Sequence, residues 1–273
     1  MPITPITIIL GTIFLWWAAT GFILLGVRMA DRSDAAGAHA WLAAISSPIF
    51  GLGLWGLWTS GQSLSTDAVI GGFLSALAVW GWIELAFLSG VITGPSKKPA
   101  PPFQRGFARL KAALATILYS ELLLIAISIW AIWLLWGAAN PFGLWTYLVL
   151  FFARISAKLN LFLGVPNINL EFLPRPVQHL ASHFKLARMN QIFPWTVTFL
   201  SFATACWLER VLAFERGSAE QTGFILLAVL TALALLEHWM MVIPMGDAKL
   251  WRWMLPKAPR DFHKNSNMQG EGK

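Results

Sequence analysis

The chain has 273 residues, of which 57% are hydrophobic and 12% charged, with a formal net charge of +7. A soluble domain carries about 25% charged residues, so this composition excludes an ordinary soluble enzyme, a disordered chain and a disulfide scaffold. Cys206 has no second cysteine to pair with, which excludes an intramolecular disulfide and a cysteine metal cluster. No soluble basic domain is left to bind nucleic acid, so the positive charge indicates an asymmetry between loops.

Apolar segments of about 20 residues recur along the chain, and each is long enough to cross a bilayer. They predict an all-α polytopic membrane protein, a bundle of about seven transmembrane helices forming one domain over 1–255. The predicted spans are 3–27, 40–60, 68–91, 113–136, 143–163, 193–212 and 222–242. No basic residue precedes Arg28, so the first segment is not expected to be a cleavable signal. Arg28 and Arg32 follow it, which predicts an external N-terminus.

The fifth span decides the topology. Its uninterrupted apolar run, 143–153, is too short for about 30 Å of hydrocarbon, so it crosses only if Arg154, Lys158 and Asn160 lie in the membrane. With seven spans, eighteen Lys and Arg residues are cytoplasmic and two are external; without the fifth span the split is nine to eleven. The positive-inside rule therefore favours seven spans with buried charge. The sequence does not decide whether the fifth helix is continuous or breaks near Asn160.

Four further segments are predicted to lie outside the spans. Apolar residues recur at helical spacing among basic ones in 175–188, which predicts an amphipathic helix on the cytoplasmic membrane surface. Segment 247–255 is a similar interfacial anchor. The Pro-rich linker 94–106 is predicted to be extended and exposed, and the polar tail 256–273 to be disordered in the cytoplasm.

Polar residues inside the spans are candidate functional residues, because a charge in hydrocarbon costs about 3 kcal/mol or more unless it is paired. These candidates are Glu84, Glu121, Arg154, Lys158, Asn160, Glu237 and His238. At 1.5 Å per residue, the charged ones lie roughly 7–14 Å from the cytoplasmic ends of their helices. We therefore predict one polar layer, with Arg154 and Lys158 pairing with Glu84, Glu121 or Glu237. The alternative is a purely structural layer that sets helix register.

His238 follows Ala234 by one helical turn, which leaves room for a flat macrocycle beside the ring. A neutral imidazole there can bind the metal of a tetrapyrrole, and Trp239 and Trp82 are candidate pigment contacts. The more common alternative is a histidine that is hydrogen-bonded inside the bundle. The sequence predicts no catalytic residue and no metal site, since paired Glu-x-x-His motifs and a His-Glu-x-x-His motif are both missing.

Several long stretches resemble the PuhE family of photosynthetic complex assembly proteins of purple bacteria. They are WGWIELAFLSGVITGP at 80–95, RISAKLNLFLGVPN at 154–167, EFLP at 171–174, LEHW at 236–239 and LWRW at 250–253. The resemblance implies a protein of the bacterial inner membrane, encoded among photosynthesis genes, that assists assembly of the reaction centre and core light-harvesting complex. The partners it implies are lipids and subunits of those complexes, with transient bacteriochlorophyll as a candidate cofactor. It supplies no established active site.

Two hypotheses from other classes remain beside an assembly factor without turnover. One is an intramembrane enzyme acting on a pigment or quinone precursor. The other is a transporter, which needs an aqueous path that the sequence does not reveal.

Overall fold

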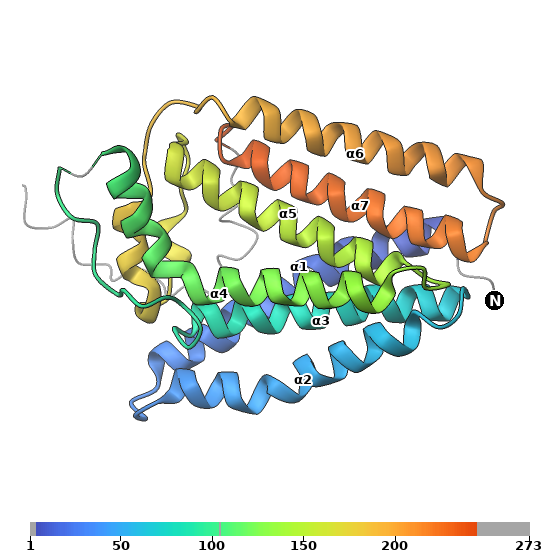
Figure 1. Ribbon diagram of the computed structural model, residues 1–273, viewed down its shortest axis with the longest axis horizontal. Coiled ribbons are helices and arrows are strands. Elements are labelled where there is room, and N and C mark those ends of the chain that lie inside the picture. The colour runs from blue at the N-terminus through green and yellow to red at the C-terminus, as the bar shows by residue number, and fades with distance from the viewer. Residues whose placement is uncertain (1–3, 104, 245–273) are drawn as a thin grey trace, which may run out of the picture.

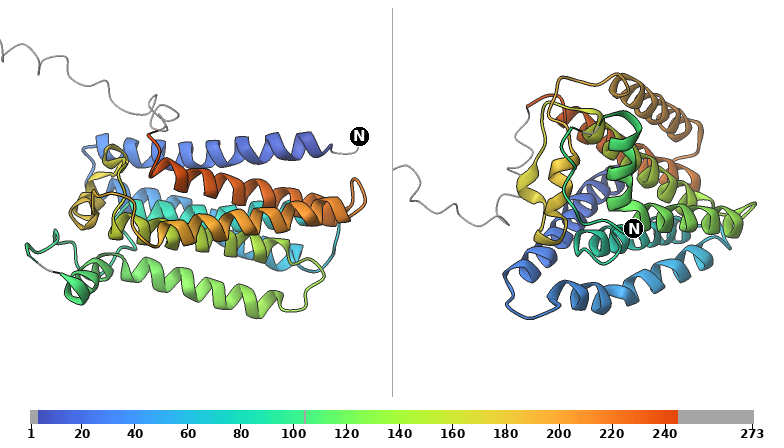
Figure 2. Two further views of the ribbon diagram at one scale, coloured as in Figure 1. Left: turned by 90° about the horizontal axis from the view of Figure 1, so that it is seen from above. Right: turned by 60° about the vertical axis from the view of Figure 1, so that its left-hand side comes forward.

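The computed structural model describes residues 4–103 and 105–244, and this part of the chain forms an antiparallel bundle of seven long helices (Figures 1 and 2). The helices are α1 (Pro5–Arg32), α2 (Ala38–Ser60), α3 (Thr66–Leu88), α4 (Gly106–Leu135), α5 (Phe142–Leu163), α6 (Phe193–Ala213) and α7 (Ala219–Met240). Two short 3-10 helices, η1 (Leu170–Phe172) and η2 (Arg175–His183), lie between α5 and α6. The predicted all-α fold is confirmed.

Hydroxyl side chains begin three of these helices. The side chains of Thr4, Ser65 and Ser218 accept hydrogen bonds from backbone N–H groups in the first turns of α1, α3 and α7. Such caps satisfy donors that have no partner inside the helix. The boundaries therefore fall within a few residues of the predicted spans, except in α4.

Six of the helices are long and apolar enough to cross a membrane, and α6 is not among them. Its Thr and Ser residues and the pair Glu209–Arg210 lower its mean hydropathy. The sequence left open whether the fifth span is continuous. In the structure it is an unbroken helix that passes through Asn160. At about 1.5 Å per residue, α6 is still long enough to span, and it lies beside α7 along the bundle (Figure 1).

Helix α7 packs against four other helices, α1, α3, α5 and α6. More than half of its apolar stretch is buried, a larger share than in the other candidate spans of the described chain. Small residues allow its neighbours α3 and α5 to pack closely against each other: a Cβ on Gly72 of α3 would lie 3.3 Å from the Cα of Gly143 of α5. Large side chains on the outer helices, such as Trp133 at 76% exposure, face outward.

The helix directions divide the charges between the two ends of the bundle. We call the end where α1, α3, α5 and α7 terminate the basic end; it lies on the left in Figure 1. Among the described residues, Arg210 and Arg216 are the basic residues that lie towards the opposite end. The predicted segregation of charge is thus present in the described part of the chain.

Helix α4 starts seven residues before the predicted span and changes direction near its first third (Figure 1). The preceding loop explains the change, because it takes over hydrogen bonds of the helix. The carbonyl of Thr93 accepts from the N–H groups of Tyr119 and Ser120, and the N–H of Ser96 donates to the carbonyl of Ala115. Insertion into the helical ladder is an established cause of kinks. The linker before Gly106 is otherwise extended and mostly exposed, as predicted.

The predicted amphipathic helix at 175–188 is present over Arg175–His183, but it is shorter than expected and of the 3-10 type. The segment forms the 3-10 helix η2 and then an extended stretch from Phe184. Its apolar residues Val177 and Leu180 are buried against Phe87 of α3, so this face covers the basic end of the bundle. Two prolines, at 174 and 176, restrict the backbone here and disfavour a regular α-helix. The predicted anchor 247–255 and the tail 256–273 lie outside the described residues.

Candidate functional site

The predicted polar layer consists of two networks on different sides of α5. Arg154 and Lys158 are one turn apart and point towards α3 and α4, whereas Ser156 and Asn160 face α6 and α7. The two pairs are offset by two residues, which on a helix separates them by more than half a turn. One helix therefore supplies both networks.

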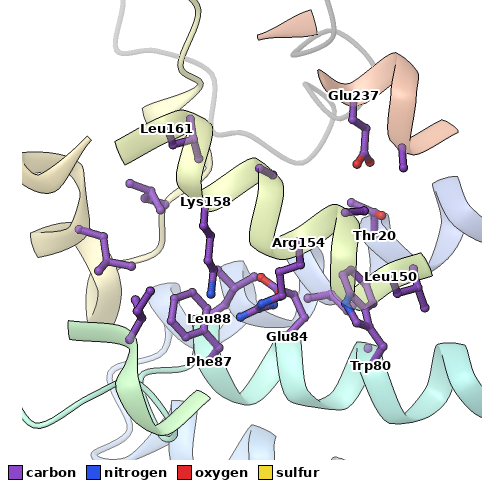
Figure 3. Close-up of a pocket in the computed structure, with 18 of the residues that line it drawn as sticks. Thr20, Trp80, Glu84, Phe87, Leu88, Leu150, Arg154, Lys158, Leu161 and Glu237 are labelled. Carbon is purple, nitrogen blue, oxygen red and sulfur yellow. The ribbon is translucent and has the colours of Figure 1, made fainter. Parts of the chain in front are cut away.

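The first network is a group of buried ion pairs. Arg154, 7% exposed, pairs through Nη1 with Glu84 of α3, and the Nζ of Lys158 lies 2.5 Å from Oε1 of Glu121 in α4. The Nε of Arg154 is also 4.0 Å from that oxygen. Both cations lie over the ring of Phe87, at 4.9 and 4.3 Å from its centroid. Figure 3 shows the side chains of Glu84, Phe87, Arg154 and Lys158 converging. The predicted pairing is confirmed for Glu84 and Glu121.

Glu237 has a different partner. Its Oε1 accepts a hydrogen bond from the indole N–H of Trp16 in α1, at 3.0 Å. Among the residues that the structure describes, Glu237 makes no ion pair. It points from α7 towards the same space as Arg154 (Figure 3). Two of the three carboxylates, Glu84 and Glu121, thus form ion pairs with the two cations, and the third, Glu237, does not within the described part of the chain.

The second network joins α5, α6 and α7 through neutral groups. Asn160, fully buried, donates to the carbonyl of Ser156 at 2.9 Å and to the hydroxyl of Thr196 at 3.3 Å. The side chain of Asn190 donates to Asn160 Oδ1 and to the Gly164 carbonyl, both at 2.9 Å. Its Oδ1 accepts from the N–H groups of Ile192 and Phe193 at the start of α6. Asn190 therefore ties the end of α5 to the beginning of α6.

We expect Asn190→Ala to lower the free energy of unfolding by about 0.5–2 kcal/mol, the usual cost of losing a helix cap. Thermal unfolding in detergent, followed by circular dichroism, measures this. Thr204→Ala is the matched control in α6, because among the described residues the Thr204 hydroxyl donates within its own helix, to the Leu200 carbonyl. An equal loss in both variants would contradict the role given to Asn190.

His238 belongs to the second network. It is 1% exposed; its Nδ1 lies 2.7 Å from the Ala234 carbonyl and its Nε2 lies 2.9 Å from the Ser156 hydroxyl. Both ring nitrogens therefore already have partners, which is the hydrogen-bonded arrangement that the sequence allowed as the alternative. Trp82 donates to the Ala43 carbonyl at 3.1 Å, and Trp239 packs edge-on against Phe193. Neither tryptophan lies at the ion pairs.

A cavity of about 400 Å³ lies beside the first network. Its walls come from α1, α3, α5 and α7, and η2 together with the start of α4 covers it towards the basic end. Most of the wall is apolar, and its charged members are Glu84, Arg154, Lys158 and Glu237. This size lies within the range of about 300–1,000 Å³ that is typical of small-molecule sites. The cavity is the candidate functional site.

Two histidines of η2 lie near the covered end of this cavity. His183 lines the cavity and its Nε2 is 3.3 Å from the Lys98 carbonyl. Burial lowers the pKa of His179, and the nearby His183 and Lys97 lower it further. Within the described ranges, no group of three or more His, Cys, Asp or Glu residues is placed to hold a metal ion.

Sequence reasoning missed Trp16, Trp80 and Asn190. A search for charged and histidine residues inside spans does not select tryptophans, and Trp80 stands out only because it is one turn before Glu84. Asn190 had a usable signal: an asparagine shortly before Pro194, at the predicted start of the sixth span, is typical of a helix N-terminus.

Comparison with known proteins places the chain in a family. A family model described as "Protein of unknown function (DUF3623)" matches residues 3–261. The chain belongs to this family. It is also 51% identical over 254 residues to a protein of Rhodobacter capsulatus named "Uncharacterized 30.4 kDa protein in puhA 5'region", covering 93% of this chain and 92% of that protein. No solved structure matches.

Proposed function

We propose that the protein is an assembly factor for the photosynthetic reaction centre and its core light-harvesting complex. The observation that carries the proposal is the name of the relative, which places its gene in the region 5′ to puhA. The resemblance to PuhE signatures supports the same role. The apolar cavity inside the bundle supports a binding function, because it offers a small lipid-soluble molecule both an apolar wall and a polar patch.

The proposed location is the bacterial inner membrane, with seven spans, a periplasmic N-terminus and a cytoplasmic basic end. The positive-inside rule supports this orientation. It places the ion pairs and the cavity in the cytoplasmic half of the membrane.

A deletion strain of a phototrophic host that encodes the protein tests the function. Near-infrared absorption of its membranes measures the reaction centre and core antenna, and chromatography of extracts measures pigments and their precursors. We expect several-fold fewer assembled complexes with no single precursor accumulating, and recovery with the wild-type gene. Normal amounts of the complexes would contradict the proposal. Accumulation of one pigment or quinone precursor would assign an intramembrane enzyme instead.

A further inference from the structure

The cavity contains N–H donors that no protein atom uses. Nε1 of Trp80 is buried and has no hydrogen-bond partner among the described residues, and the same is true of Nη2 of Arg154. Both side chains line the cavity. Leaving a buried donor without an acceptor costs about 1–3 kcal/mol, so two such donors at one cavity favour binding of an acceptor from outside the chain.

The two donors lie on side chains that are each near Glu84. Trp80 precedes Glu84 by one turn of α3, and Arg154 of α5 is held against Glu84 by its ion pair. The pair fixes the guanidinium through Nη1 and leaves its other terminal nitrogen free. Figure 3 shows both side chains, Trp80 from α3 and Arg154 from α5, among the residues that line the cavity. The cavity therefore offers N–H donors from two helices, α3 and α5, to a bound molecule.

The charged side chains of the cavity favour a neutral acceptor over an anionic one. Arg154 and Lys158 are already paired with Glu84 and Glu121, and Glu237 adds a further carboxylate. An anionic headgroup such as a phosphate would approach three carboxylates that have only two cations beside them, and such proximity of like charges is unfavourable. A neutral carbonyl or ester oxygen accepts from both donors and disturbs neither ion pair.

The apolar part of the cavity wall indicates what the rest of the bound ligand is like. Leu77, Leu150, Ala153 and Leu230 contribute apolar surface from α3, α5 and α7. A volume of about 400 Å³ accommodates one ring system or one chain, but not a whole two-chain lipid. The occupant is therefore small or enters with one part only.

We propose that this cavity binds a neutral, lipid-soluble molecule through a carbonyl-type oxygen that accepts hydrogen bonds from Trp80 and Arg154. Membrane quinones and the ester- and keto-bearing chlorins both carry such oxygens. The inference deepens the proposed function by assigning a ligand class to its site. It is tested by ligand binding to the purified protein, whereas the role in assembly is tested in a deletion strain. Either proposal can therefore fail while the other stands.

The test is a titration of the full-length protein in mild detergent with four probes. Decylbenzoquinone and bacteriopheophytin represent the two sources of the proposed oxygen, decyl phosphate is the anionic probe, and decylbenzene has an apolar body without an acceptor. We expect saturable binding of at least one neutral oxygen-bearing probe, and the stronger of the two identifies the source. Tighter binding of decyl phosphate, equal binding of decylbenzene, or binding of neither neutral probe would overturn the proposal.

Trp80→Phe removes the indole N–H and keeps an aromatic ring on the wall. We expect it to weaken binding of the favoured probe by about 2–10-fold, the effect of one lost hydrogen bond. Trp207→Phe is the matched control, because Nε1 of Trp207 is also buried without a partner in the described structure but Trp207 does not line the cavity. Thermal unfolding confirms that both variants fold. Equal affinities of the two variants would exclude the Trp80 donor and overturn the assignment.

Discussion

Replacing Arg154 with leucine is expected to lower the free energy of unfolding by about 3–5 kcal/mol, the usual cost of removing one member of a buried ion pair. The change leaves Glu84 as an uncompensated charge inside the bundle, because Arg154 is its ion-pair partner in the described structure. Unfolding in mixtures of dodecyl maltoside and sodium dodecyl sulfate, followed by circular dichroism, measures the loss. The steady-state amount of protein in membranes should fall with it.

The double variant Glu84→Leu/Arg154→Leu makes this prediction specific to the pair. It removes both charges, so we expect it to be more stable than Arg154→Leu alone. Arg210→Leu is the control, since Arg210 pairs with Glu209 while their side chains are 51% and 61% exposed. Such exposed pairs contribute about 0–1 kcal/mol. If Arg154→Leu were no more harmful than Arg210→Leu, the buried pair would not stabilise the bundle.

Gly94→Ala is expected to cost about 1–3 kcal/mol, the range for overpacking a filled site. A Cβ at position 94 would lie 2.2 Å from the Ala115 carbonyl oxygen and 2.6 Å from the Thr116 carbonyl carbon. These are backbone atoms of α4, which cannot rotate away as a side chain can. The loop must therefore leave the helix, and its hydrogen bonds to Ala115 and Tyr119 are lost.

Hydrogen–deuterium exchange distinguishes this mechanism from general destabilisation. In Gly94→Ala we expect faster exchange of the Tyr119 and Ser120 amides, which donate to Thr93, relative to amides of α7. Gly51→Ala is the matched control, because a Cβ there meets nothing within 4 Å and alanine stabilises a helix interior by up to about 1 kcal/mol relative to glycine. Unchanged exchange in α4 would show that the loop does not hold the kink.

The two polar networks differ in whether their hydrogen-bonding groups are all used within the protein. The second network, with His238 and Asn160, satisfies its polar groups internally and joins three helices. The first network pairs its charges but leaves N–H donors of Trp80 and Arg154 unused beside a cavity. Ligand binding is therefore proposed at the ion pairs, while His238 contributes to packing in this structure.

Much of the fold followed from the sequence because membrane-spanning helices obey one strong constraint. In hydrocarbon every backbone polar group must be satisfied within the segment, so apolar length predicts helices directly, and six of the predicted spans meet that criterion in the structure. The segments outside the spans were harder. Residues 175–188 have helical periodicity, but Pro174 and Pro176 and the packing against Phe87 produce a 3-10 helix instead.

Depth along a helix is a property of sequence, whereas direction around it depends on neighbours. The rise per residue correctly brought Glu84, Glu121, Arg154 and Lys158 to one level, because it requires only span boundaries. Which carboxylate meets which cation, and the partnering of Glu237 with Trp16, depend on how the helices rotate and pack. The cavity and its unused donors arise from that packing alone. The sequence by itself thus determined the helices, the segregation of basic residues to one end of the bundle, and the polar layer. Only the tertiary structure decided which residues pair within that layer and formed the cavity beside it.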